Sequence, residues 1–186
     1  MMEQLKEQNN IIKDMVPRIG DNNSNNNFSI NVFLNETCRD AINLSEFLAS
    51  IKVKLDDLKY TKTNGLVEGI SSVLVNGLRE LETCKRPIHC TDVKRETLYI
   101  KENNEWERDE GIDSKAMLRN AIGTVADKQR KAIADWENQN PGWDESEKGK
   151  DEYLKIVRSV MADVSQENEE NRIIKNIAKE VQLNKN

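Results

Sequence analysis

The segment that decides the fold class is LYIKENNEWERD, residues 98–109. Residues 98–102 and 105–109 have the alternating character of short strands. Asn103-Asn104 lies between them, and asparagine tolerates the positive φ values that a tight two-residue hairpin turn requires. The segment therefore predicts an antiparallel β-hairpin, and the β character extends back to residue 88.

A two-residue loop also determines which side chains share a face of the hairpin. Lys101 is expected opposite Trp106, and Tyr99 opposite Arg108, all on one side of the ribbon. Leu98 and Ile100 fall on the other side, which we predict to be the core face. The first side thus combines two aromatic residues with two cations.

Basic residues also precede the hairpin, where five cations stand against Asp92 and Glu96 between residues 85 and 101. Aromatic and basic side chains on one ribbon can stack on bases and contact phosphates. The predicted nucleic-acid or partner face consists of Lys85, Arg86, Lys94, Arg95, Tyr99, Lys101, Trp106 and Arg108. The alternative is structural, with Trp106 capping the core and Lys101 and Arg108 packed over its ring.

Outside this region the apolar residues recur mainly at helical spacing. The pattern predicts helices from Asn43 onward with Ser45 as a cap, over residues 66–82 and 113–137, and from about residues 151 and 170. Phe28, Ile30 and Val32 alternate with polar residues and predict a short strand. The predicted fold class is α+β and mostly helical, with helices packed on a small antiparallel hairpin or three-stranded sheet.

We predict that the chain divides into three segments. Residues 1–20 predict a coiled-coil-like helix with Leu5, Ile12 and Met15 at heptad-like spacing. So short a helix is marginal alone and needs a partner, so we expect a homo-oligomer, a frayed terminal helix being the alternative. Residues 21–27 form an Asn-rich linker, and residues 28–186 are predicted to be a single α+β core domain.

The composition of the 186-residue chain limits the partners and the cellular location that we expect. Its net charge of −5 argues against nucleic-acid binding through the overall field of the protein. No stretch approaches the roughly 20 apolar residues that span a bilayer, so no membrane partner is expected. Three cysteines do not make a disulfide framework, and an intracellular, reducing location is the simplest interpretation.

The cysteines and the single histidine are the residues that most invite a chemical interpretation. Cys38, Cys84, His89 and Cys90 together offer four zinc ligands. Adjacent residues of a strand point to opposite faces, however, so His89 and Cys90 cannot share a metal or act as a base–nucleophile pair. The paired ligand spacing of zinc sites and the motifs of common enzymes are also absent. We predict half-buried structural thiols, no metal, no cofactor and no catalytic residue.

Residues 135–152 form an acidic connection that contains Trp136 and Trp143. Seven acidic residues stand here against Lys148 and Lys150. The connection is a possible docking site for a basic partner. The alternative is a solvated loop with its tryptophans packed onto the core.

Three strings resemble an uncharacterised protein family of giant DNA viruses. They are residues 33–41 (FLNETCRDA), 85–92 (KRPIHCTD) and 96–101 (ETLYIK), followed by Trp106, and the resemblance covers residues 28–182. In some longer members this module follows a zinc finger of the two-Cys-two-His type and a coiled-coil segment, and the finger is absent from this sequence. The resemblance implies a viral protein of the host cytoplasm or viral factory, or of the virion, associated with the viral genome or its expression machinery.

The sequence thus predicts a non-enzymatic viral accessory module that self-associates and contacts nucleic acid through the basic and aromatic hairpin. The alternative is a protein–protein interaction or virion-structural component without nucleic-acid binding.

Overall fold

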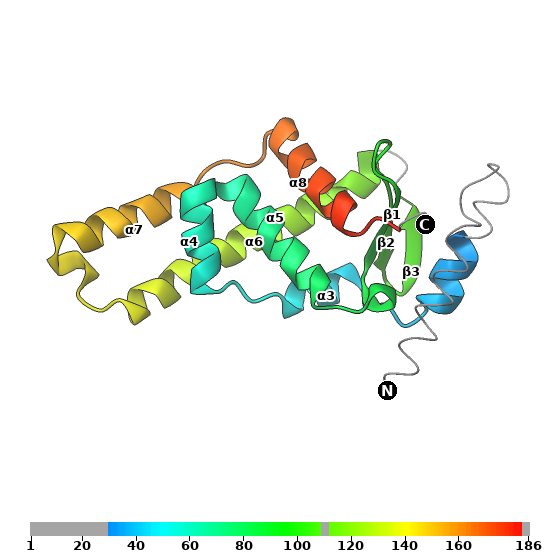
Figure 1. Ribbon diagram of the computed structural model, residues 1–186, viewed down its shortest axis with the longest axis horizontal. Coiled ribbons are helices and arrows are strands. Elements are labelled where there is room, and N and C mark those ends of the chain that lie inside the picture. The colour runs from blue at the N-terminus through cyan, green and yellow to red at the C-terminus, as the bar shows by residue number, and fades with distance from the viewer. Residues whose placement is uncertain (1–29, 109–111, 184–186) are drawn as a thin grey trace.

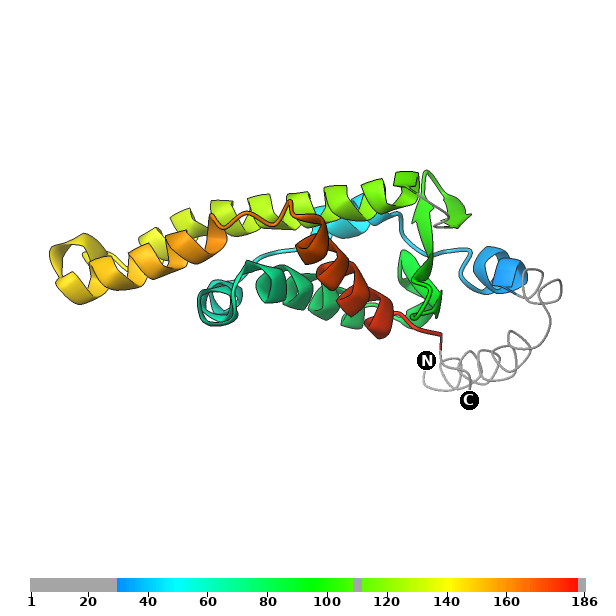
Figure 2. The same ribbon diagram turned by 90° about the horizontal axis from the view of Figure 1, so that it is seen from above.

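The computed structural model describes residues 30–108 and 112–183 of the chain. The molecule is elongated, with a small sheet at one end and a hairpin of two helices at the other (Figures 1 and 2). The elements are η2 (Phe33–Thr37), α3 (Leu44–Ser50), α4 (Leu55–Asn64), α5 (Leu66–Arg79), η3 (Thr83–Lys85), β1 (Ile88–Asp92), β2 (Thr97–Glu102), β3 (Glu105–Arg108), α6 (Ile112–Gln139), η4 (Trp143–Glu145), α7 (Glu147–Val160) and α8 (Glu167–Glu180). The predicted mostly helical α+β class is confirmed.

The sheet is antiparallel with the strand order β1-β2-β3. Lys101 pairs with Trp106 and Tyr99 with Arg108, so the predicted hairpin register is confirmed. Asn103 and Asn104 form the turn with φ values of 51° and 63°. The local sequence determines this register because the turn needs two residues that tolerate positive φ.

The inner face of the sheet contributes to the main hydrophobic cluster. Ile88, Cys90, Leu98 and Ile100 alternate along β1 and β2 and are fully or almost fully buried. They pack with the apolar faces of α3, α5, α6 and α8. Leu98 and Ile100 were predicted on the core face, and the structure confirms this.

The helix predictions are largely confirmed, with shifted ends. The structure has α5 and α6 where residues 66–82 and 113–137 predicted helices, while α7 and α8 begin a few residues earlier than expected. Asn43, rather than Ser45, is the N-cap of α3, and its backbone N–H donates to Glu46. The sequence did not predict α4, because Leu58 and Thr61 are its only buried residues and give too weak a periodicity.

The predicted strand around Phe28, Ile30 and Val32 is wrong at Ile30 and Val32, and Phe28 lies outside the described residues. Residues 30–32 are helical and lead into the π-helical turn η2. Ile30, Phe33 and Leu34 are buried, at the i, i+3, i+4 spacing of a helix face. Three alternating residues are too few to outweigh that spacing.

The far end of the molecule is built by α4, α7 and the C-terminal part of α6. A separate hydrophobic cluster there consists of Leu58, Ala132, Ile133, Trp136, Ile156 and Val160, and Val53 packs against both this cluster and the main one. The rings of Trp143 and Tyr153 stack 4.0 Å apart, and Trp136 lies 5.9 Å from Tyr153. The tryptophans of the acidic connection therefore pack onto the helices, as the structural alternative expected.

Several predictions fall outside the described residues. These are the helix at residues 1–20 with Leu5, Ile12 and Met15, the linker at residues 21–27, and self-association through that helix. Within the described ranges, no helix has both the length and the apolar character needed to cross a membrane.

Candidate functional site

A covering segment, residues 30–41, lies over the outer face of the sheet, the face that carries the predicted basic and aromatic side chains. Figure 1 shows its helix beyond the sheet, on the side away from the other helices. Its apolar side chains form an outer hydrophobic cluster with the strands and the C-terminal end, consisting of Ile30, Phe33, Leu34, Cys38, Ala41, Tyr99 and Leu183. The part of the predicted face formed by Tyr99, Lys101 and Trp106 is therefore largely an internal contact.

Lys101 was predicted to be exposed on this face, and that prediction is wrong. Its side chain is 4% exposed. The Lys101 ammonium donates to the carbonyl oxygens of Arg39 and Ala41, at 2.6 and 2.9 Å. A buried charge requires such partners, and carbonyls just beyond a helical turn provide them. Lys101 thus fastens the covering segment to the sheet.

Tyr99 is 5% exposed, so its predicted exposure is also wrong. Trp106 is partly buried and packs against the outer cluster, with its ring centre 5.4 Å from that of His89. The ring centre of Phe33 lies 5.5 Å from that of His89 in an edge-to-face contact. These contacts favour the structural interpretation of Trp106.

His89 is almost fully buried among these rings. Within the described part of the chain, neither of its ring nitrogens nor Trp106 Nε1 has a hydrogen-bond partner. Burial, with a smaller contribution from the nearby Arg86 charge, lowers the pKa of His89 to about 3. The imidazole is therefore neutral at physiological pH.

The other predicted cations divide into two groups. Lys85 donates to the carbonyl oxygen of Asp40 at 3.3 Å, and Arg86 to those of Leu81 and Glu180. Lys85 thus connects η3 to the covering segment, and Arg86 connects the chain after α5 to the end of α8. Lys94, Arg95 and Arg108 are exposed on the strands' ends, and Arg95 pairs with Asp92 at 3.8 Å.

The contact between Cys38 and Cys84, at the edge of the outer cluster, was not predicted from the sequence. Cys38 is fully buried, Cys84 is half-buried, and their thiols share a hydrogen bond. That bond lowers the pKa of Cys84 to about 7 and raises the pKa of Cys38. No spacing rule joins these two positions, because η3 and the covering segment meet only through the fold.

The remaining thiol lies on the other face of the sheet. Cys90 belongs to the main cluster while the adjacent His89 contacts Phe33 and Trp106, so the two side chains point apart as predicted. Burial raises the pKa of Cys90 to about 11. Across residues 30–108 and 112–183, no group of three or more His, Cys, Asp and Glu side chains is arranged to hold a metal ion.

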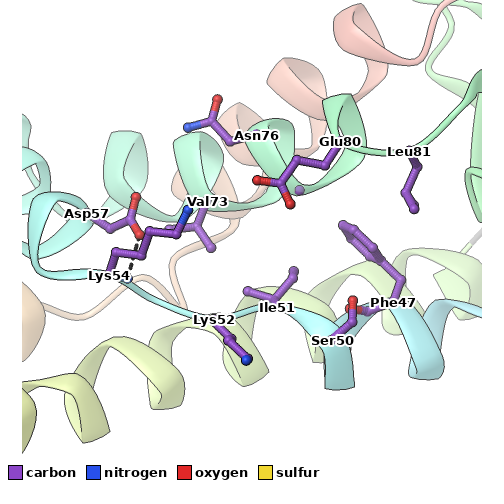
Figure 3. Close-up of a pocket in the computed structure, with 11 residues that line it drawn as sticks. Phe47, Ser50, Ile51, Lys52, Lys54, Asp57, Val73, Asn76, Glu80 and Leu81 are labelled. Carbon is purple, nitrogen blue, oxygen red and sulfur yellow. Dashed lines mark hydrogen bonds between the residues drawn. The ribbon is translucent and has the colours of Figure 1, made fainter.

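A groove of about 640 Å³ runs between α5 and the connection from α3 to α4 (Figure 3). Its apolar lining includes Phe47, Ile51 and Val73, which are buried, and Leu81, which is half-buried. Gly77 also belongs to this lining, and it packs closely on Phe47, since a Cβ at this position would lie 3.1 Å from the Phe47 ring. Side chains of the hydrophobic core thus form the floor of this groove, and its rim is polar, with Ser50, Lys52, Lys54, Asp57, Asn76 and Glu80.

Charged side chains lie at both ends of the groove, with both signs at one end and a negative charge at the other. Figure 3 shows Lys54 and Asp57 at one end, with Lys54 extending toward α5, and Glu80 with Leu81 near the other. Asp57 accepts a hydrogen bond from the backbone N–H of Lys54 at 2.7 Å. Lys54 and Glu80 are exposed, and neither forms an ion pair within the described residues.

Comparison with models of protein families, with curated proteins and with solved structures finds no match.

Proposed function

We propose that this chain is a non-enzymatic protein-interaction module that binds a short segment of a partner protein in the groove beside α5. The observation that carries the proposal is a groove whose floor is formed by core side chains and whose polar rim carries two exposed charges of opposite sign, Lys54 and Glu80. An apolar floor with a few polar groups at its edge is the usual composition of a binding site.

The shape of the groove favours a peptide segment as its occupant. Its wall on the α5 side is formed by Val73, Asn76 and Gly77 of α5 and by Glu80 and Leu81, which directly follow the helix. From Val73 to Leu81 this wall extends about 12 Å, at a rise of about 1.5 Å per residue. That length accommodates about two turns of an amphipathic helix or about four extended residues.

The exposed charges of Lys54 and Glu80 give the segment a direction, while the carboxylate of Asp57, beside Lys54, accepts a hydrogen bond from the Lys54 backbone N–H. Lys54 complements an acidic residue at one end of the peptide, and Glu80 complements a basic residue at the other. Apolar side chains between them would occupy the floor at Ile51 and Val73. Electrostatic complementarity of this kind sets orientation more than it sets affinity.

The test is selection from a displayed random-peptide library on the wild-type chain, with counter-selection on Glu80→Trp. The new indole would occupy the groove from an exposed position. Enriched peptides are expected to carry apolar anchors between an acidic and a basic end. Fluorescence anisotropy should show that they bind wild type and lose binding to Glu80→Trp.

Asp135→Trp is the matched control, because it makes the same charge change at an exposed position of α6 outside the groove. It should bind like wild type. Lys54→Glu should weaken binding roughly 1.5- to 5-fold, since an exposed ion pair contributes about 0.2–1 kcal/mol. Peptides that bind Glu80→Trp as well as they bind wild type would refute the proposal.

Nucleic-acid binding is a second candidate, favoured by one observation. Lys94 and Arg95 project from the β1–β2 turn and are exposed. Binding through them should weaken steeply with salt, and Lys94→Ala with Arg95→Ala should reduce the salt slope by about one unit for each phosphate that the protein no longer neutralises. Salt-insensitive or absent binding would exclude it.

The setting we propose for either activity comes from the resemblance to the giant-virus family. It is that of a viral accessory or virion-structural protein in the host cytoplasm or viral factory. Self-association through Leu5, Ile12 and Met15 is part of the same proposal. Light scattering on the chain with and without residues 1–20 tests it, because an unchanged mass would contradict it.

A further inference from the structure

The Cys38–Cys84 pair lies where the covering segment passes η3. Hydrogen bonds hold the two backbones together beside the pair. Ile42 N–H donates to the carbonyl oxygen of Lys85 at 3.2 Å, and the Lys85 ammonium donates to that of Asp40 at 3.3 Å. Cys84 also packs against the outer cluster that contains Cys38. The two cysteines are therefore kept close together by groups other than the thiols themselves.

The two thiols differ in the way that a reactive and a resolving cysteine differ. Cys84 is half-buried and open to solvent on one side, whereas Cys38 is fully buried in the outer cluster. The Cys38 thiol donates its hydrogen bond to the Cys84 sulfur, which lowers the pKa of Cys84 to about 7. A substantial fraction of Cys84 is therefore present as the nucleophilic thiolate near neutral pH.

We infer that Cys84 and Cys38 form a peroxide-reactive redox pair, in which Cys84 reacts with the peroxide and Cys38 resolves the product as an intramolecular disulfide. The inference is independent of the groove, because none of the groove's lining residues belongs to the pair.

The chemistry takes two steps with hydrogen peroxide as the oxidant. The Cys84 thiolate attacks one peroxide oxygen, so that an S–O bond forms, the O–O bond breaks, and the departing hydroxide takes up the proton that Cys84 had given up. Cys84 becomes a sulfenic acid and the peroxide becomes water. The Cys38 sulfur then attacks the Cys84 sulfur, the S–O bond breaks, and the hydroxide leaves as water with the Cys38 proton.

The product would change how the covering segment is held. In the reduced protein, hydrogen bonds from Lys101 and Lys85 and apolar contacts keep residues 30–41 on the sheet. The disulfide would add a covalent link between this segment and η3. Oxidation should therefore fix the covering segment over the outer face of the sheet, and a reductant should break the disulfide and restore the reduced state.

The test is treatment of the reduced full chain with about one equivalent of hydrogen peroxide, followed by intact-mass measurement and peptide mapping. Wild type is expected to lose two hydrogens, to link the peptides containing Cys38 and Cys84, and to show a raised Tm that dithiothreitol reverses. Cys38→Ser should accumulate a sulfenic acid on Cys84, trapped by dimedone. Cys84→Ser should react at least about tenfold more slowly, because a thiol is a far weaker nucleophile than a thiolate.

Cys90→Ser is the matched control and should behave like wild type, since Cys90 lies in the main cluster on the opposite face. A measurement on wild type alone removes dependence on the variants: the rate of iodoacetamide alkylation at Cys84 should rise with a midpoint near pH 7. Three results would each overturn the inference. They are disulfides only between molecules, equal reactivity of Cys84→Ser and wild type, and overoxidation of Cys84 in wild type without a disulfide.

Discussion

Lys101 lies on β2 with its ammonium 2.6 Å from the carbonyl oxygen of Arg39 and 2.9 Å from that of Ala41. Replacing it by Ala removes both bonds and leaves these acceptors without their partner. We expect Lys101→Ala to lower the free energy of unfolding by about 1–3 kcal/mol, the usual consequence of an unsatisfied buried polar group. Denaturant melts measure this difference.

Lys94→Ala is the control for that substitution, because Lys94 is exposed on the β1–β2 turn. Its effect should stay within about 0.5 kcal/mol. If both variants unfolded at the same denaturant concentration as wild type, the ammonium of Lys101 would not hold the covering segment.

The buried His89 leads to a second prediction for a single residue, which concerns how the stability of the protein depends on pH. Its folded pKa of about 3 lies below the ordinary value of 6.5, because burial disfavours the charged imidazole. The unfolded chain therefore takes up a proton that the folded chain does not. The contribution of His89 to stability is complete above pH 6.5 and is lost as the pH falls from 6.5 toward 3.

His89→Leu removes this titration and also removes two buried nitrogens without partners in the described residues. Between about pH 6.5 and 4, wild type should lose up to about 1.4 kcal/mol of stability per pH unit relative to the variant. Urea melts of both proteins across this range provide the comparison. Parallel pH profiles would show that the imidazole is solvated or protonated in the folded state.

At the scale of the element, the packing of α4 on α5 depends on one glycine. A Cβ at Gly69 would lie 2.0 Å from Thr61 Oγ1 and 2.8 Å from Thr61 Cβ. Thr61 is fully buried and donates a 3.0 Å hydrogen bond to Gln129 of α6. Gly69→Ala would therefore separate α4 from α5 and disturb that bond, at a cost of about 1–3 kcal/mol.

Gly123 is the matched control on a neighbouring helix. A Cβ there meets no atom within 4 Å. Gly123→Ala should raise stability by about 0.5–1 kcal/mol, because alanine loses less conformational freedom in a helix interior. Thermal melts of the two variants should move in opposite directions, and two shifts of the same sign would contradict the described contact between Gly69 and Thr61.

Comparing the predicted helices and strands with the observed ones shows which elements the sequence could predict. The hairpin register followed from Asn103-Asn104 and from alternation, because both are local. The helix α4 was missed because it presents few buried residues to the pattern. The strand expected at Ile30 and Val32 was wrong because Ile30, Phe33 and Leu34 pack as one helix face in the outer cluster, whose other members, such as Tyr99 and Leu183, are distant in the sequence.

The candidate sites were harder to predict for the same reason. Alternation correctly placed Tyr99, Lys101 and Trp106 on one face, but it carries no information about what covers that face. The Cys38–Cys84 contact and the groove beside α5 join segments that no local pattern relates. Both required the tertiary structure.

At the scale of the whole molecule, the hydrophobic clusters follow one another along the long axis. The outer and main clusters flank the sheet, and the far cluster lies between α4, α6 and α7. Figure 2 shows α6 running the length of the molecule and α7 folding back along its far half. The principal contacts of α7 are with α4, η4 and the far half of α6. The far cluster is linked to the main cluster by α6, by the packing of α4 on α5 and by Val53, whereas α7 itself has no principal contact with the described strands, α5 or α8.

This arrangement predicts that the far end opens independently of the sheet. Trp136 is 5% exposed in the far cluster, and Trp136→Ala should weaken that cluster by about 3–5 kcal/mol. If opening is sub-global, amide hydrogen exchange should accelerate in α7 and the end of α6 while β1 and β2 keep their protection. The reciprocal variant, Leu98→Ala, truncates a fully buried residue of β2 and should accelerate exchange in the sheet. Equal acceleration of α7 and the sheet by Trp136→Ala would instead mean that α6 couples all the clusters into one cooperative unit, because loss of the far cluster would then cost stability everywhere.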